Sequence, residues 1–381
     1  MVNVEPGAAG RDRLDSRVPT IGVEEEFVLV DRDSGRPVGR NREVAAAASA
    51  RGLDLELELT SSQVEIATPT AVSGEEIGTH LRRLRTILVD AAREVGVDVV
   101  ACGVPPRVPD SFPVTDTGRY RAIAARYGML AHEQGISGCH VHVGVPDTDT
   151  AVSVCNWMRP WLPALLAVSA NSAIYRDADS GHASWRSVLW SRWPAAGPPP
   201  HLRSAEHYAD IVKVLVATGA ILDPHMLYWD VRPSDHLPTV EVRVGDVQMR
   251  VEETQAFASI VRAAVMTALD DGATGARASA VLDSALLSAA YWTAAHDGLD
   301  GQAVDPATGA LLPAWSRVDQ LLTVIGPALD RSGERESVDA VLQTMRTEGN
   351  GASRQRRIFD ATGTGLAVVR AATVGRELGP G

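Results

Sequence analysis

The chain has 381 residues and carries 48 acidic against 36 basic side chains, which gives a net charge of −12. This balance excludes the basic face that a nucleic-acid-binding protein needs. The hydrophobic fraction of 45% excludes a disordered chain, and no apolar run is long enough to span a membrane. Only Lys213 is a lysine, and it lies in Val-Lys-Val, so a P-loop is also excluded.

The first residues, 1–19, form a polar leader without the apolar centre of a signal peptide. The three cysteines form neither a C-x-x-C motif nor a dense disulfide pattern, so we expect a cytoplasmic protein. In chain order, apolar alternation then predicts strands at 20–31, 53–59, 97–101, 139–145, about 225–231 and 239–244. Helical periodicity predicts helices at 73–96, about 119–132, 151–174 with a break at Pro160 and Pro163, and 204–219, and over almost all of the chain from Val251.

These elements predict one α+β catalytic domain over residues 20–381, strand-rich over 20–246 and mostly helical over 247–381. The candidate functional residues lie on the strands. Glu24 and Glu26 share one face of a strand, with the apolar Val28 and Val30 on the same face and apolar Val23, Phe27 and Leu29 on the other. Buried carboxylates need a cation or an arginine, which favours a metal site, while two solvated acids at an edge-strand end are an equal alternative.

Glu58 and Glu65 are a second acidic pair, for which a solvated strand face is the stronger interpretation when they are taken alone. His140 and His142 share a strand face, and Cys139 lies on the opposite face, so we do not expect Cys139 to act as a nucleophile. A metal site and a hydrogen-bonded core pair are equally good interpretations of the two histidines.

Glu241 and Arg243 share one face of a further strand, where they form either a salt bridge or part of a phosphate site. Taken together, the four strands offer mainly oxygen ligands, which suit Mg²⁺ or Mn²⁺ better than zinc. With arginine nearby and no P-loop, this combination predicts phosphoryl transfer organised by metal ions and arginine.

The same residues resemble a known family, the type 2 glutamate–cysteine ligase-like carboxylate–amine ligases. The matching segments run in family order over nearly the whole chain: Gly22-Val-Glu-Glu-Glu-Phe27, Ser62-Gln-Val-Glu65, Gly138-Cys-His-Val-His-Val-Gly144, Ser184-Trp-Arg-Ser187, Trp190-Ser-Arg-Trp-Pro194, Asp230-Val-Arg-Pro-Ser-Asp-His-Leu-Pro238, Glu241-Val-Arg-Val244 with Asp246, and Gly351-Ala-Ser-Arg-Gln-Arg356.

The resemblance implies a glutamine-synthetase-like fold, in which an antiparallel cupped sheet with flanking helices binds ATP and divalent metal ions. It also implies a reaction in which ATP phosphorylates a carboxylate, typically the γ-carboxylate of glutamate, and an amine such as cysteine attacks the acyl phosphate. The products are an amide, ADP and phosphate. The expected partners are these small molecules, with no nucleic acid or membrane, and a homodimer is expected.

By position in the motifs, the resemblance implies metal ligands at Glu24, Glu26, Glu58, Glu65, His140 and Glu241. Arg243 would steady the transferred phosphoryl group, and substrate contacts are expected at His142, Arg186, Arg232 and Asp246. We assign the tryptophans at 185, 190 and 193 to the core.

Two other functions are compatible with parts of the sequence. A metallohydrolase could be built on His140 and His142, although the histidines at 182, 201, 207, 225 and 236 show no second ligand motif. A non-catalytic binding homologue is the other alternative, but such a protein would be expected to have lost part of the acidic set.

Overall fold

The computed structural model describes residues 18–274 and 281–375. Its centre is a seven-stranded sheet with the strand order β2-β3-β1-β5-β9-β8, to which β4 is added by pairing with β1. All the pairings in this sheet are antiparallel. Its strands are β1 (Ile21–Asp31), β2 (Glu56–Leu57), β3 (Gln63–Ala67), β4 (Val97–Val100), β5 (Gly138–Gly144), β8 (Val231–Pro233) and β9 (Thr239–Asp246).

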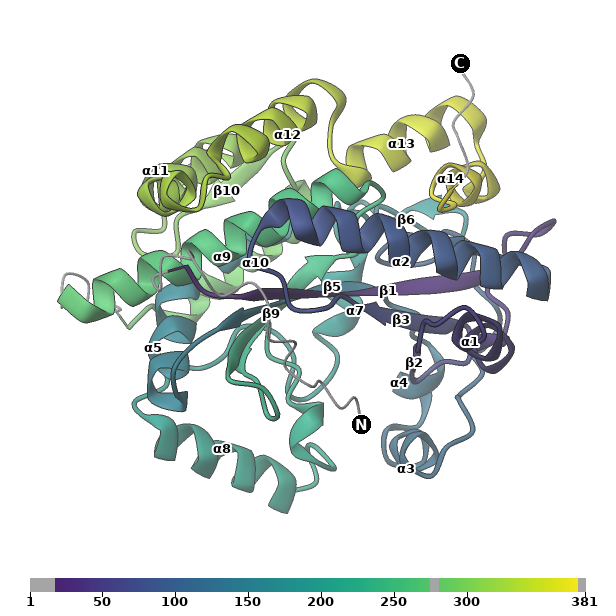
Figure 1. The fold of residues 1–381 in the computed structure, drawn as a ribbon, viewed down its shortest axis with the longest axis horizontal. Helices are drawn as coiled ribbons and strands as arrows, with labels where there is room; N and C mark the ends of the chain where they lie inside the picture. The colour runs from purple at the N-terminus through teal and green to yellow at the C-terminus, as the bar shows by residue number, and fades with distance from the viewer. Residues whose placement is uncertain (1–17, 275–280, 376–381) are drawn as a thin grey trace.

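Helices cover both sides of the sheet (Figure 1). In the first part of the chain they are α1 (Asn41–Ser49), α2 (Gly74–Val95), α3 (Gly118–Tyr127), α4 (Met129–His132), α5 (Thr148–Met158), α6 (Leu162–Ser169), α7 (Trp185–Trp190) and α8 (Ala205–Ala217). The later helices are α9 (Val251–Thr274), α10 (Ser284–Asp297), α11 (Ala314–Ser332), α12 (Arg335–Glu348), α13 (Gly351–Thr362) and α14 (Gly365–Ala371). Within the described ranges, no helix is both long and apolar enough to cross a membrane.

The two faces of the sheet differ in polarity, and this difference positions the functional residues. Phe27 on β1 and Val141 on β5 are fully buried and belong to a core that includes Leu81 of α2 and Phe257 of α9. Because side chains alternate along a strand, the residues next to Phe27 on β1 and next to Val141 on β5 face the opposite side of the sheet. Helices α2 and α9 therefore close one face, and the charged side chains collect on the other.

The longest helix of the first half, α2, has local signals at both ends. Ser73 accepts a hydrogen bond from the Glu76 backbone amide at 3.2 Å, and the Glu76 carboxylate accepts one from the Val72 amide at 2.9 Å. The helix ends at Gly96, whose φ of 83° is left-handed and suits glycine. The expected helix at 73–96 is confirmed.

The expected α+β class, with an antiparallel sheet and a helical final third, is also confirmed. The polar leader lies almost entirely outside the described residues. In the final third, helices are interrupted by a small hairpin of β10 (Gln302–Val304) and β11 (Leu311–Pro313). Another short hairpin, β6 (Ile174–Tyr175) and β7 (Ala178–Asp179), precedes α7.

Three expectations about individual elements were wrong. Of the strand expected at 53–59, only Glu56–Leu57 forms a strand, and these two residues pair with Glu65 and Val64 of β3. The strand expected at about 225–231 begins only at Val231, since Pro224–Met226 form a 3₁₀ turn, η1. The helix expected at 119–132 is divided at Gly128, whose φ is 56°.

Candidate active site

The register of the sheet brings the predicted acidic and histidine residues into one row across five strands. Glu65 of β3 lies opposite Glu26 of β1, and Glu24 lies opposite His140 of β5. The row continues on the next strands, where Glu241 of β9 lies between His142 of β5 and Arg232 of β8. Antiparallel pairing therefore places in contact side chains that are up to 217 positions apart in the chain.

Side chains of this row form three overlapping groups whose ligand atoms lie within 4.8 Å of one another. The groups are Glu24 with Glu65 and His140, Glu24 with His142 and Glu241, and Glu26 with Glu58 and Glu65. All six residues expected to bind metal thus lie together, including Glu58, which follows the end of β2. His142, expected at a substrate, lies inside the same cluster.

The two imidazoles are buried and only partly satisfied. His140 Nδ1 lies 3.2 Å from a Glu24 oxygen, and His142 Nδ1 lies 3.1 Å from the Thr239 hydroxyl. Neither Nε2 atom has a hydrogen-bond partner within the described structure. The Nε2 of His142 is 3.3 Å from Glu24 and 3.9 Å from Glu241, and the Nε2 of His140 is 3.7 Å from Glu26, so both Nε2 atoms face carboxylates. Buried nitrogens of this kind are suited to a ligand that the protein itself does not provide.

The carboxylates differ in how readily they ionise. Burial, followed by the charge of Glu26, raises the pKa of Glu58 to about 8. Burial and then the charges of Glu24 and Glu58 raise the pKa of Glu65 well above its usual range. For Glu24, burial opposes ionisation, but the neighbouring imidazoles of His140 and His142 hold its pKa well below the ordinary value. The Glu58–Glu65 end of the row therefore holds protons more tightly than free carboxylic acids do, and a bound cation would displace them.

Two arginines bracket the Glu241 carboxylate. The Arg232 Nε donates to it at 2.7 Å, and Arg243 forms an ion pair with its other oxygen. Burial opposes ionisation of Glu241, yet the charges of Arg243 and Arg232 lower its pKa below the ordinary value. Arg232 also donates to the carbonyls of His225 and Leu227, so its guanidinium is engaged in holding Glu241 and the 3₁₀ turn.

A small cavity of about 80 Å³ adjoins the acidic row. Glu26, Glu58 and Arg243 belong to both the row and the cavity wall, and Arg186 and Tyr228 also line the cavity. Further wall residues, which the sequence interpretation did not identify, are Thr60, Gln63 and Gln134. Trp190 and Trp193 also line the cavity, so these two tryptophans have a second role besides packing.

The expectation that Asp246 contacts substrate is not supported by its position. Asp246 is fully buried and accepts hydrogen bonds from the Ser172 and Ser184 hydroxyls at 2.6 and 2.9 Å. Its carboxylate lies 3.9 Å from the guanidinium of Arg186, a residue that lines the cavity. Asp246 therefore lies behind the cavity as a support for Arg186.

Cys139 is fully buried on the helical side of the sheet, and burial raises the pKa of its thiol well above the ordinary value. This agrees with the expectation that it is not a nucleophile.

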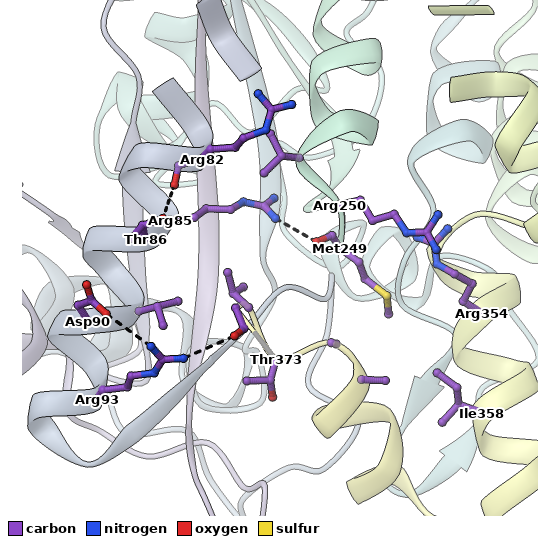
Figure 2. A pocket seen from close by; sticks show the side chains of 16 residues that line it. Arg82, Arg85, Thr86, Asp90, Arg93, Met249, Arg250, Arg354, Ile358 and Thr373 are labelled. Carbon is purple, nitrogen blue, oxygen red and sulfur yellow. Dashed lines mark hydrogen bonds and ion pairs between the residues drawn. The ribbon is translucent and has the colours of Figure 1, made fainter. Parts of the chain in front are cut away.

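A larger cavity, of about 690 Å³, lies on that helical side, between α2, α13 and the end of the chain (Figure 2). It is lined by five arginines, and each of them is paired within the protein: Arg82 with Glu252, Arg85 with Glu25, Arg93 with Asp90, Arg250 with Glu348 and Arg354 with Glu253. Because these charges are already neutralised and the acidic row lies on the other face, this cavity has no part in the chemistry proposed below.

Comparison with known proteins places the chain in a family. The family described as Glutamate-cysteine ligase family 2 (GCS2) matches residues 20–373. A protein of Mycolicibacterium vanbaalenii named "Putative glutamate--cysteine ligase 2-2" is 54% identical over 342 residues, which cover 90% of this chain and 93% of that protein. A Nocardia farcinica protein named "Putative glutamate--cysteine ligase 2-1" is 51% identical, covering 92% of this chain and 91% of that one. The chain belongs to this family, and it is an ATP-dependent carboxylate–amine ligase.

Solved structures support the fold. Glutamate–cysteine ligase from Francisella tularensis, in complex with AMP, superposes with a TM-score of 0.69 at 15% identity, covering 93% of this chain and 87% of that chain. A bifunctional glutathione synthetase from Pasteurella multocida gives a TM-score of 0.65 at 15% identity, covering 93% of this chain and 52% of that chain. The family match and the curated relatives confirm the expected family, and the metallohydrolase and non-catalytic alternatives lose their support.

Proposed function

We propose that the protein uses ATP and Mg²⁺, with Mn²⁺ as a possible substitute, to phosphorylate the γ-carboxylate of glutamate or of a related amino acid. A carboxylate oxygen attacks the γ-phosphorus of ATP, and ADP leaves. The nitrogen of an amine, cysteine or another amino compound, then attacks the acyl carbon, loses a proton and expels phosphate. The observation that carries this proposal is the row of five glutamates and two partly unsatisfied histidines on one face of the sheet.

The acidic row fits divalent cations by its donor chemistry. It offers mainly carboxylate oxygens, the ligands that Mg²⁺ and Mn²⁺ prefer, together with imidazole nitrogens that lack a partner. We propose that Glu24, Glu26, Glu58, Glu65, His140 and Glu241 hold these ions, and that His142 joins them. When bound, the ions would neutralise the triphosphate oxygens and the charge that develops during transfer.

Arg243 is proposed as the protein's own cation at the transferred phosphoryl group. It lies in the cavity wall and is paired with Glu241, and the charges of Glu241 and Glu26 outweigh burial and raise its pKa, so it stays protonated. Its buried Nε has no hydrogen-bond partner among the described residues and is therefore available to an oxygen ligand. An arginine in this state stabilises charge in the transition state without having to gain a proton.

The cavity beside the row is proposed to receive the acid substrate. Arg186 lines the cavity, is 2% exposed and has an Nε without a partner among the described residues, so it can bind a carboxylate there. Trp190 and Tyr228 would pack against the substrate and limit the access of water to the acyl phosphate. In this arrangement Arg232 and Asp246 act through Glu241 and Arg186, without touching substrate.

The proposal is tested by incubating the protein with ATP, Mg²⁺ and a matrix of amino acids and amines, measuring phosphate and ADP and identifying the amide by mass spectrometry. We expect release to require both an acid and an amine and to be greatest with glutamate as the acid. ATP hydrolysis that is independent of every acid tested would contradict the proposal. A homodimer remains a prediction, which light scattering would test.

A further inference from the structure

A second cluster of metal-binding side chains lies on the surface, outside the acidic row. The cluster consists of His225 in the 3₁₀ turn and Asp235 and His236 in the β8–β9 loop. Each residue offers one ligand atom, and these three atoms lie within 4.8 Å of one another. All three side chains are exposed. They are distinct from the residues assigned to the nucleotide and its metal ions. Sequence patterns do not reveal the cluster, because a strand and a turn separate His225 from His236.

The geometry of the two imidazoles is that of metal ligands. Their Nε2 atoms face each other at 3.3 Å, with the ring centroids 4.6 Å apart. Two nitrogens at the usual zinc distance, on neighbouring corners of a tetrahedron, are separated by roughly 3.3–3.4 Å. An ion placed between them would need only small movements of exposed side chains, and Asp235 supplies a third, anionic ligand.

We propose that His225, Asp235 and His236 form a site for a transition-metal dication of the Zn²⁺ class, separate from the Mg²⁺-type site of the acidic row. Two imidazoles and one carboxylate are a donor set for Zn²⁺, Ni²⁺ or Cu²⁺, whereas Mg²⁺ prefers oxygen ligands. Because the cluster is exposed, solvent completes the coordination.

The position of the site gives it a mechanical role. The loop residues Leu237 and Pro238 follow His236 directly and form one wall of a cavity of about 270 Å³ that also contains Glu24 and His142. His225 is linked to the acidic row as well, because Arg232 donates both to the His225 carbonyl, at 3.2 Å, and to Glu241, at 2.7 Å. A metal ion would therefore fasten this loop to the 3₁₀ turn and hold the cavity wall in place.

The test measures bound metal in the full-length protein after dialysis against Zn²⁺ and then against metal-free buffer. We expect His225→Ala, His236→Ala and the double variant each to lose the same single equivalent of Zn²⁺. His80→Ala, a change on α2 away from the cluster, should lose none. Zn²⁺ held by the acidic row should remain in the histidine variants. Glu65→Gln should reduce only the Zn²⁺ bound by the acidic row. Thermal melts in chelator check that each variant folds, and Asp235→Asn provides an independent change in the same site.

Two further measurements distinguish a metal site that holds the loop in place from two histidines that only contact each other. Co²⁺ bound by the wild type should give the visible absorption of a low-symmetry site, and both histidine variants should lose it. Zn²⁺ should slow hydrogen exchange of the backbone amides at 234–239 in the wild type and not in His236→Ala. Equal Zn²⁺ content in the wild type and both histidine variants, or unchanged exchange in the loop, would overturn the proposal. Neither result depends on whether the substrates have been identified correctly.

Discussion

Glu25 and Arg85 form a buried two-point ion pair on the reverse side of the strand that carries Glu24 and Glu26. The Arg85 Nε and Nη2 atoms donate to the two Glu25 oxygens at 2.8 and 2.6 Å, and the side chains are 5% and 0% exposed. Arg85 also donates to the carbonyls of Gln248 and Met249, and Thr254 donates to Glu25. The pair therefore fastens β1 to α2 and to the start of α9, directly behind the acidic row.

Breaking this pair should destabilise the protein strongly. Arg85→Met leaves the Glu25 charge buried with only the Thr254 hydroxyl, and removal of one partner of a buried pair costs about 3–5 kcal/mol. Urea unfolding followed by circular dichroism measures the change. Arg51→Ala, which removes the half-exposed pair with Glu94, is the matched control and should cost less than about 1 kcal/mol. A loss for Arg85→Met no larger than that of the control would show that the pair does not fasten β1.

Removing Arg243 should slow phosphoryl transfer strongly, and Arg232 should keep the Glu241 charge paired so that the protein still folds. We expect Arg243→Ala to lower ADP formation by about a hundredfold or more, because the transferring group loses a fixed cation. Arg243→Lys should restore little, since an ammonium group cannot reproduce the guanidinium fork. Arg203→Ala, an exposed change outside the cavity, is the control. Near-normal ADP formation by Arg243→Ala, with an unchanged melting temperature, would remove Arg243 from the mechanism.

Glu65→Gln should have opposite effects on stability and on function. In chelator, the variant should be more stable than the wild type by on the order of 1 kcal/mol, because Gln is neutral beside Glu24, Glu26 and Glu58 without the proton that buried Glu65 must take up. The same change removes a proposed ligand, so stabilisation by Mg²⁺ with ATP should fall sharply.

The control for Glu65→Gln is Glu56→Gln, since Glu56 pairs with Glu65 across β2 and β3 but is exposed. Thermal melts with chelator, with Mg²⁺ and with Mg²⁺ and ATP measure all three proteins side by side. If Glu65→Gln destabilised the protein in chelator and still responded fully to Mg²⁺ and ATP, Glu65 would be a structural residue.

Strand alternation was sufficient to place most of the acidic row, and the sheet register explains why. His140 and Glu241 alternate with apolar neighbours, and Glu24 shares its face with Glu26, so the face on which each lies follows from the period of two once the strands are known. Which strands are neighbours does not follow from periodicity. The family resemblance implied only that these residues act together, and the sheet register shows which strands bring them into contact.

The sequence could not predict features that depend on distant packing. Asp246 ends β9 opposite Gly138, beyond a register shift between Cys139 and Val141. Its carboxylate accepts hydrogen bonds from the hydroxyls of Ser172 and of Ser184, the residue before α7. The Glu25–Arg85 pair joins residues 60 positions apart. The contact of His225 with His236 depends on a 3₁₀ turn where the alternation favoured a strand.

Asp230 should make stability depend on pH. It is 4% exposed at the start of β8, and burial raises its pKa from 3.8 to about 6. Between these two values the folded protein keeps a proton that the unfolded chain releases, so protons favour the folded state. Stability from this group is therefore present at low pH and is lost as the pH rises through about 6, by up to about 3 kcal/mol.

Asp230→Asn removes that ionisation, so the difference in unfolding free energy between variant and wild type should grow in the variant's favour from pH 4 to pH 7 by an amount on the order of that loss. Other groups titrate in both proteins and cancel in the difference. Urea unfolding at a series of pH values measures it, with Asp210→Asn, exposed and paired with Lys213 on α8, as the control that should show almost no trend. A difference that stays constant with pH would mean that Asp230 is ionised in the folded protein at little cost, which requires Arg186 to compensate fully for its burial.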